Sequence, residues 1–191
     1  MRGDITQVSV AGVDATALIS SVSDTEIQLT LPAGLRAGVQ GLQVIQPSMM
    51  GTPLAPHRGT ESNLAAFVLH PKIKKLPGDI PDITVPAPVI AGDGTRSANV
   101  TIKLSPNVSQ PQRAVLFMNE FNPPGNRAAR ACSFDSSPHN KTGDPAETDT
   151  LVFPIHGVRD GVYLARVQID GADTALEQDP DPNDPVYVGQ R

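Results

Sequence analysis

Apolar and polar residues alternate along several short stretches of this 191-residue chain. The clearest are residues 26–31, 98–104, 151–155 and 163–170, each closely followed by residues that favour turns, such as Pro, Gly, Ser or Asp. A period of two places every second side chain on the same face of a β-strand. These four stretches are therefore predicted to be half-buried strands.

Residues 113–118 show a different pattern, a continuous apolar run that begins after Arg113. Such a run is typical of a central strand covered on both faces. Helical spacing of apolar residues is not sustained anywhere, and only residues 126–133 contain helix formers enough for a turn or two. Strand signals recur about every 8 to 15 residues, as in β-sandwiches. The sequence predicts an all-β fold.

The segment 71–81 holds three prolines and three lysines and separates two groups of strand signals. A predicted strand at 66–69 precedes it, and new strand signals follow at 83–85 and 89–90. A Pro-rich, charged segment between apolar runs is typical of a domain boundary. We therefore expect two tandem sandwiches, at residues 1–72 and 78–191, joined by a linker at 73–77.

Composition narrows the possible functions. The chain has no Trp, two Tyr and five Phe, so Val, Ile, Leu and Ala must fill the cores. Its net charge is −5: the residues up to Lys75 carry +1 and the residues after it carry −6. The acidic second part disfavours binding to nucleic acid. The single cysteine cannot form an internal disulfide. No signal peptide or apolar run of about 20 residues is present, so we expect no membrane insertion and a cytoplasmic location.

Three motifs in the first part of the chain carry a family resemblance. They are VSVAGVDA at 8–15, VSDTEI at 22–27 and LPAG at 31–34. This pattern resembles the TIG/IPT family of immunoglobulin-like domains: a strand, a tight glycine turn, and a second strand that SDTEI opens and LPAG closes. The resemblance covers residues 4–70 and implies that the first sandwich is TIG/IPT-like. It also implies that a first strand of the family is missing. Either the sequence is a fragment of a longer protein, or one sheet edge is left open for pairing with another chain.

A second resemblance covers nearly the whole chain. Residues 31–47, 56–73 and 149–171 are similar to the C-terminal region of the cap, or tail-terminator, proteins of phage-tail-like contractile injection systems. In that family a terminator domain precedes tandem immunoglobulin-like domains, and the protein closes the tube and sheath. The resemblance implies a structural part of an assembled cytoplasmic particle, with neighbouring subunits as partners.

Motifs for catalysis or metal binding are missing from the sequence. His57, His70, His139 and His156 are far apart and show no zinc spacing. Cys132 lies in an apolar context, where a buried inert thiol is the more frequent case. An acidic, Pro-rich run, Asp179, Asp181 and Asp184, lacks the spacing of a calcium loop. We therefore expect no enzyme activity, no cofactor and no bound metal.

Two apolar segments beside turn signals are the candidate interface residues. They are Met49 with Met50, and Phe121 with Pro123 and Pro124. Flexible methionines and aromatic side chains are common in protein interfaces. The alternative is that both segments fold back over an open end of a sandwich.

These observations favour a non-enzymatic structural or docking module of an injection-system cap. The alternative is an extracellular adhesion or carbohydrate-binding module, because immunoglobulin-like folds serve both purposes.

Overall fold

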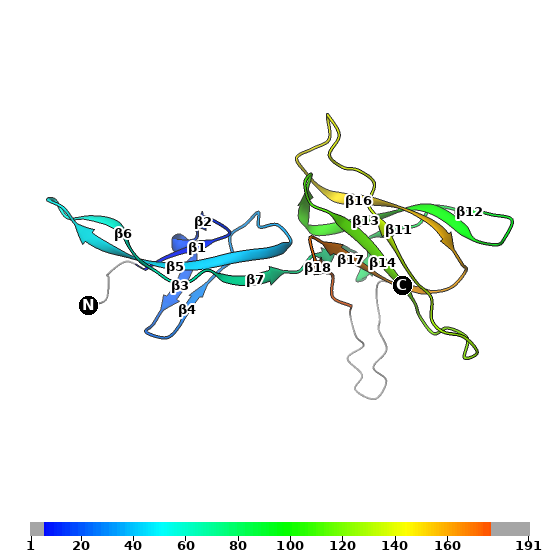
Figure 1. Cartoon of the computed structure of the whole chain (residues 1–191), viewed down its shortest axis with the longest axis horizontal. Coiled ribbons are helices and arrows are strands. Elements are labelled where there is room, and N and C mark those ends of the chain that lie inside the picture. The colour runs from blue at the N-terminus through cyan, green and yellow to red at the C-terminus, as the bar shows by residue number, and fades with distance from the viewer. Residues whose placement is uncertain (1–5, 177–191) are drawn as a thin grey trace. The chain divides into compact units, whose positions relative to one another are not determined.

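The computed structural model describes residues 6–176 of the chain (Figure 1). It divides into two compact units, each described here by itself. The first contains the residues up to Leu35 together with Val39–Leu69, and the second contains Arg36–Gly38 and the residues from His70 onward. Both are built from strands, and the described residues include one short 3-10 helix and no α-helix. The prediction of an all-β fold is confirmed.

The first unit has two small sheets. Their elements are β1 (Gln7–Val10), β2 (Val13–Asp14), η1 (Thr16–Leu18), β3 (Ile19–Val22), β4 (Ile27–Leu29), β5 (Gly38–Met50), β6 (Ala55–Glu61) and β7 (Ala65–Leu69). The larger sheet has the order β2-β1-β5-β6, with β7 also paired to β5, and β3 and β4 form the second sheet. The predicted strand at 26–31 is present as the shorter β4.

Few side chains are fully buried in the first unit. Val8, Val10 and Ala15 form its buried centre, and half-buried side chains from β3, β4, β5 and β7 pack around them. The turn after β1 is fixed locally, because the Thr16 hydroxyl accepts a hydrogen bond from the Val8 amide and donates one to Asp14. The core of this unit is thin.

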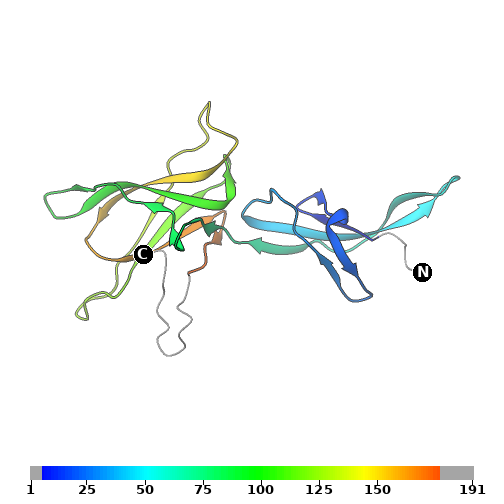
Figure 2. The same cartoon turned by 180° about the vertical axis from the view of Figure 1, so that it is seen from behind.

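A long hairpin formed by β5 and β6 extends beyond the other strands of the first unit (Figures 1 and 2). Its register shifts between Gln46 and Ser48, where a bulge is present. Gly59 lies against this bulge, and a β-carbon on it would approach the Gln46 carbonyl oxygen to 2.2 Å. Only glycine fits so close to a neighbouring backbone, so Gly59 sets the shape of the hairpin.

The second unit contains eleven strands among the described residues. They are β8 (Lys72–Ile73), β9 (Lys75–Leu76), β10 (Ile80–Pro81), β11 (Ile83–Thr84), β12 (Val89–Ile90), β13 (Arg96–Ser109), β14 (Ala114–Glu120), β15 (Ala131–Asp135), β16 (Glu147–Val158), β17 (Tyr163–Ile169) and β18 (Ala172–Asp173). One sheet is built on β13, which pairs with β8, β11, β12 and β16, and the other has the order β15-β14-β17-β18.

The two main sheets of the second unit share one core, the arrangement of a β-sandwich. Ile102 and Phe153 from the first sheet and Leu116 and Val167 from the second belong to the same buried cluster. The predicted strands at 98–104, 151–155 and 163–170 are all present, within longer strands in the first two cases. β14 lies between two strands of its sheet, as predicted for the apolar run at 113–118.

Two segments differ from the sequence-based expectation. Residues 73–77, predicted as a linker, are instead placed in the second unit, where β8 pairs with β13 and the buried Ile73 joins the core. Residues 126–133, predicted as a helical turn or two, form no helix: residues 126–130 are a loop and residues 131–133 belong to β15. The Arg127 amide donates one turn hydrogen bond to the Pro124 carbonyl, and the Arg127 side chain is held by Glu120.

No helix within residues 6–176 has both the length and the apolar character needed to cross a membrane.

Candidate functional site

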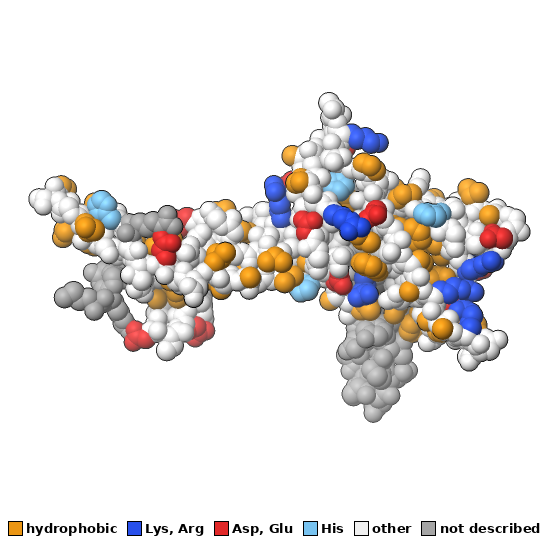
Figure 3. Space-filling view, in the orientation of Figure 1, with side chains coloured by type: hydrophobic (Ala, Val, Ile, Leu, Met, Phe, Trp, Pro, Cys, Tyr) orange, Lys and Arg blue, Asp and Glu red, His pale blue; other side chains and the backbone are white. Residues whose placement is uncertain are grey.

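The tip of the β5–β6 hairpin presents hydrophobic side chains to solvent. Met49, Met50 and Leu54 are 48%, 57% and 69% exposed. Met49 pairs with Pro56 and Met50 with Ala55, so the tip is an ordinary antiparallel hairpin end with a turn at residues 51–54. Residues 47–57 contain no Asp, Glu, Lys or Arg. Figure 3 shows orange hydrophobic side chains and a pale-blue histidine at this tip.

This hairpin tip is an adaptable apolar surface. Methionine side chains are flexible and polarizable, and an exposed apolar group without charges can be buried by a partner at no cost in charge desolvation. The structure thus places the predicted residues Met49 and Met50 on one exposed feature.

The second predicted segment lies in the loop after β14. Phe121 and Pro123 are half-buried and Pro124 is exposed. The Phe121 amide donates a hydrogen bond of 2.8 Å to the Val162 carbonyl, which ties the loop to the start of β17. Phe121 and Pro124 line a shallow depression of about 430 Å³ together with Arg127. Phe121 is therefore partly covered by its own unit, while Pro124 stays exposed, and the interface role of this segment stays a prediction.

A buried carboxylate holds this loop in place. The Glu120 side chain is 4% exposed and forms an ion pair with Arg127. Its Oε2 also accepts a hydrogen bond of 3.0 Å from the Arg130 amide. The hydrogen bond from Arg127 outweighs the burial of the carboxyl and lowers the pKa of Glu120 to about 2. The network thus braces the loop between β14 and β15.

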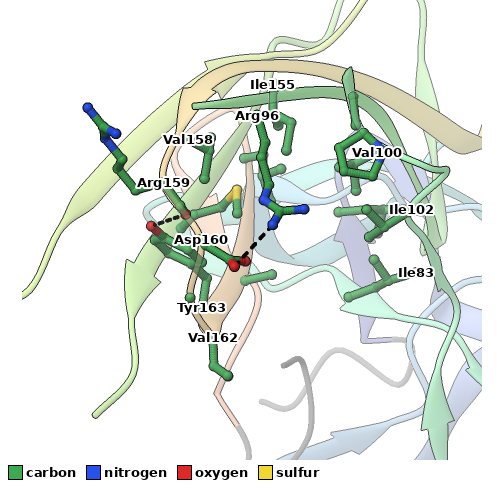
Figure 4. A pocket seen from close by; sticks show the side chains of 17 residues that line it. Ile83, Arg96, Val100, Ile102, Ile155, Val158, Arg159, Asp160, Val162 and Tyr163 are labelled. Carbon is green, nitrogen blue, oxygen red and sulfur yellow. Dashed lines mark hydrogen bonds and ion pairs between the residues drawn. The ribbon is translucent and has the colours of Figure 1, made fainter. Parts of the chain in front are cut away.

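An apolar cavity of about 320 Å³ opens between the two sheets of the second unit (Figure 4). Its floor is the inner face of both sheets, with Val100 and Ile102 from β13 and Leu116 from β14. Tyr163 and Ala165 of β17 form one wall. The lining is apolar except at the rim, where the charged residues Arg96, Arg159 and Asp160 lie. The sequence pattern predicted these strands but gave no sign that the core is open at this place.

The guanidinium of Arg96, at the rim, has only part of its hydrogen bonds satisfied. Its Nη2 lies 3.0 Å from a carboxylate oxygen of Asp160, as the dashed line in Figure 4 marks. Its Nε is buried and has no hydrogen-bond partner within the described residues. A buried donor without an acceptor costs free energy, so this atom is a place where a bound acceptor would stabilise the fold.

The four histidines have separate local roles. His70 Nδ1 lies 2.8 Å from the Asp173 carbonyl, and His139 Nε2 lies 3.3 Å from the Ser109 carbonyl. His156 packs edge-on against Phe134, with ring centroids 5.3 Å apart, and His57 is exposed on β6. Within residues 6–176 no cluster of three or more His, Cys, Asp or Glu residues is arranged to hold a metal ion.

Cys132 on β15 is half-buried, and burial raises the pKa of its thiol. A raised pKa lowers the thiolate fraction and makes this sulfur a poor nucleophile at neutral pH. The acidic run of Asp179, Asp181 and Asp184 and the predicted final strand at 186–188 lie outside the described residues.

Comparison with known proteins gives one match. A protein-family model described as "Domain of unknown function (DUF8756)" matches residues 80–188, more than half of the chain. The searches of curated proteins and of solved structures found no match.

Proposed function

Because this chain belongs to the DUF8756 family, whose description names no activity, we propose a function from its own residues: it is a non-enzymatic docking module of a larger protein assembly. The carrying observation is the charge-free hairpin tip with Met49, Met50 and Leu54 exposed. Interface centres are depleted in charged residues and enriched in methionine. The tip has this composition and projects on a long hairpin, where a partner can reach it.

The proposed assembly is the cap of a contractile injection system. The support is the resemblance of residues 31–47, 56–73 and 149–171 to that family, together with immunoglobulin-like sandwiches as the proposed fold of both units. Met49, Met50 and Leu54 lie between the first and the second of these stretches, so the resembling residues flank the proposed docking surface on both sides. The tube, the sheath or an anchoring protein of the same particle would be the partner.

An edge of the first unit offers a second kind of contact. Within residues 6–176, β6 pairs only with β5, so its other edge has no strand beside it. An uncovered edge is a template for strand addition from another chain. We propose self-association through such an open edge as this second contact; the edge that a missing first strand would leave is a separate prediction.

The test is co-expression of the full chain with the sheath and tube proteins encoded beside its gene. We expect the tagged chain to copurify one of these proteins as a complex of defined mass by light scattering. The double substitution M49S with M50S is expected to abolish the complex. Val13→Ser is the matched control, since Val13 is also an exposed apolar residue of the first unit. A gene that stands apart from sheath, tube and baseplate genes would overturn the assignment.

Carbohydrate binding is the alternative function. Sugar-binding surfaces generally use exposed aromatic faces, and the chain has no Trp. Tyr163 is buried in the core, and its hydroxyl donates a hydrogen bond of 2.9 Å to the Arg159 carbonyl. Specific micromolar binding on a glycan array would favour the alternative over docking.

A further inference from the structure

The edge of β17 is covered over only part of its length. The short β18 pairs with Gln168 and Ile169, and Thr174 continues this contact by exchanging hydrogen bonds with Val167. Within residues 6–176 no strand pairs with the remainder of the edge, from Tyr163 to Arg166. As far as the described residues go, this part of the sheet is therefore open for a further strand.

The backbone of β17 is oriented to receive such a strand. In an antiparallel pair, alternate residues turn their amide and carbonyl groups toward the same neighbour. The Val162 carbonyl bonds the Phe121 amide on the β14 side, and the Ile169 and Val167 groups face β18 and Thr174. The same alternation turns the backbone groups of Tyr163 and Ala165 outward.

The open edge borders the apolar cavity. Tyr163 and Ala165, whose backbone groups face outward, also line the cavity of about 320 Å³. On the facing side lie Val85 and Pro88, in the stretch between β11 and β12 that has no strand pairing to β13. A strand laid along β17 would therefore point every second side chain into an apolar space between the two sheets.

An unmet hydrogen bond at the rim indicates what else the segment should carry. Arg96 is paired with Asp160 and Arg159 with Asp93, so the charges of the rim are balanced. Asp160 engages Nη2 of Arg96, whereas the buried Nε of Arg96 has no acceptor within the described residues. A carboxylate on the incoming segment would supply that acceptor as a charge-assisted hydrogen bond.

We propose that the second unit binds an extended segment of another protein as an added strand along Tyr163–Arg166, with alternate apolar side chains in the cavity and a carboxylate beside Arg96. This strand-binding site lies in the other unit from the hairpin tip and does not depend on it. Main-chain hydrogen bonds along the edge supply affinity, and the cavity selects the apolar pattern. The partner is thus defined by its chemistry, a short acidic segment with apolar residues at every second position.

The probe is a synthetic peptide, acetylated and amidated, of sequence Asp-Val-Thr-Val-Thr-Val-Asp. We expect the full chain to bind it in titration calorimetry, with NMR shifts centred on the Tyr163 and Ala165 amides. Ala165→Leu, which fills the cavity wall, is expected to weaken binding about tenfold or more. Ala131→Leu on the edge strand β15 is the matched control and is expected to bind as the native chain does. Both variants are checked for native folding by their NMR spectra.

Two further peptides separate the parts of the proposal. A version with alternate N-methyl amides keeps the side chains but cannot pair along an edge, and it should not bind. In a second version Asn replaces both Asp residues. The native chain should bind this version more weakly than the Asp peptide, whereas Arg96→Gln should bind the two peptides equally. No binding of the first peptide, or binding that A165L leaves unchanged, overturns the proposal. A chain ending at Leu176 that binds the peptide while the full chain does not would also overturn it, since the site would then belong to the chain's own C-terminal residues. M49S with M50S leaves all these results unchanged, so the two proposals fail separately.

Discussion

The two units differ most in how much apolar surface they bury. Among residues 6–176, the buried cluster of the first unit has three apolar side chains, Val8, Val10 and Ala15, whereas that of the second contains sixteen. Hydrophobic burial is the main stabilising contribution to folding, and small cores leave a domain marginal. The second unit therefore carries most of the stability of the chain, and the first carries an exposed hairpin on a thin support. A docking surface does not need a large core beneath it.

The largest effect is expected from Phe153→Ala. Phe153 is fully buried between the sheets of the second unit, so its loss should lower the free energy of unfolding of that unit by about 3–5 kcal/mol. Urea unfolding followed by tyrosine fluorescence measures it, because the chain has no Trp, residues 1–69 contain no Tyr, and Tyr163 is buried in the core of the second unit. Val89→Ala, at a 73% exposed position, should change this value by less than about 0.5 kcal/mol. An unchanged urea midpoint for F153A would contradict the assignment of the core.

Val10→Ala removes fewer atoms than Phe153→Ala but is expected to unfold the first unit completely. Val10→Ala removes apolar surface worth about 2 kcal/mol. Because the core of the first unit is so thin, this loss should unfold it selectively, with fast hydrogen exchange at the Val8 amide. Tyrosine fluorescence of the second unit should stay native. Loss of both signals together would show that the units unfold as one, and the comparison between them would fail.

Acid should act on the second unit through Glu120. Its pKa is lowered from 4.5 to about 2, so the folded form holds the carboxylate more strongly than the unfolded form does. The resulting stabilisation is complete above pH 4.5 and is lost as the pH falls from 4.5 to about 2. Thermal unfolding at several pH values measures the loss.

Arg127→Met removes the partner of Glu120 and should flatten the pH dependence of the second unit while lowering its melting temperature at pH 7. Arg113→Met is the matched control, because Arg113 and its partner Asp135 are both exposed. An exposed pair contributes little to stability. Equal pH profiles for the native chain and R127M would assign the acid sensitivity to other carboxyls.

The smallest effect on stability is expected at the hairpin tip. Met50→Ser replaces a side chain that is mostly in solvent, so the free energy of unfolding of the first unit should change by less than about 0.5 kcal/mol. Hydrogen exchange at the Val8 amide measures it. A larger loss would mean that Met50 packs within its own unit, and the tip would then not be a free docking surface.

The strand content of the chain could be predicted from its sequence because the strong strands alternate clearly. Residues 98–104 and 163–170 have one buried face, and a period of two is the direct record of that burial. The segment 73–77 could not be assigned in this way. Its two lysines and Pro77 are typical of a linker, whereas Ile73 is buried in the core and pairs with β13, a strand some thirty residues later.

The exposed hairpin tip could be predicted from Met49 and Met50, because two apolar residues beside a turn signal are hard to bury. The cavity could not. Its lining comes from β11, β13, β14, β16 and β17. The alternation in β13, β16 and β17 and the apolar run in β14 are the patterns that a closed sandwich would also have. The opening depends on where the neighbouring strands stop, such as β18 ending at Asp173, and single-strand patterns do not carry that information.

The two prolines of the hairpin limit how its strands can pair with those of a second copy. Pro47 in β5 and Pro56 in β6 have no amide hydrogen, so each removes a donor from a strand that ends in an exposed apolar tip. A sticky tip on an uninterrupted ribbon would invite identical ribbons to stack without limit. With the Pro56 donor removed from β6, a second copy can pair along that edge over a few residues at most, so the proposed self-association stops short of a continuous ribbon. The exposed methionines of the tip can then make contacts through their side chains without starting a fibre.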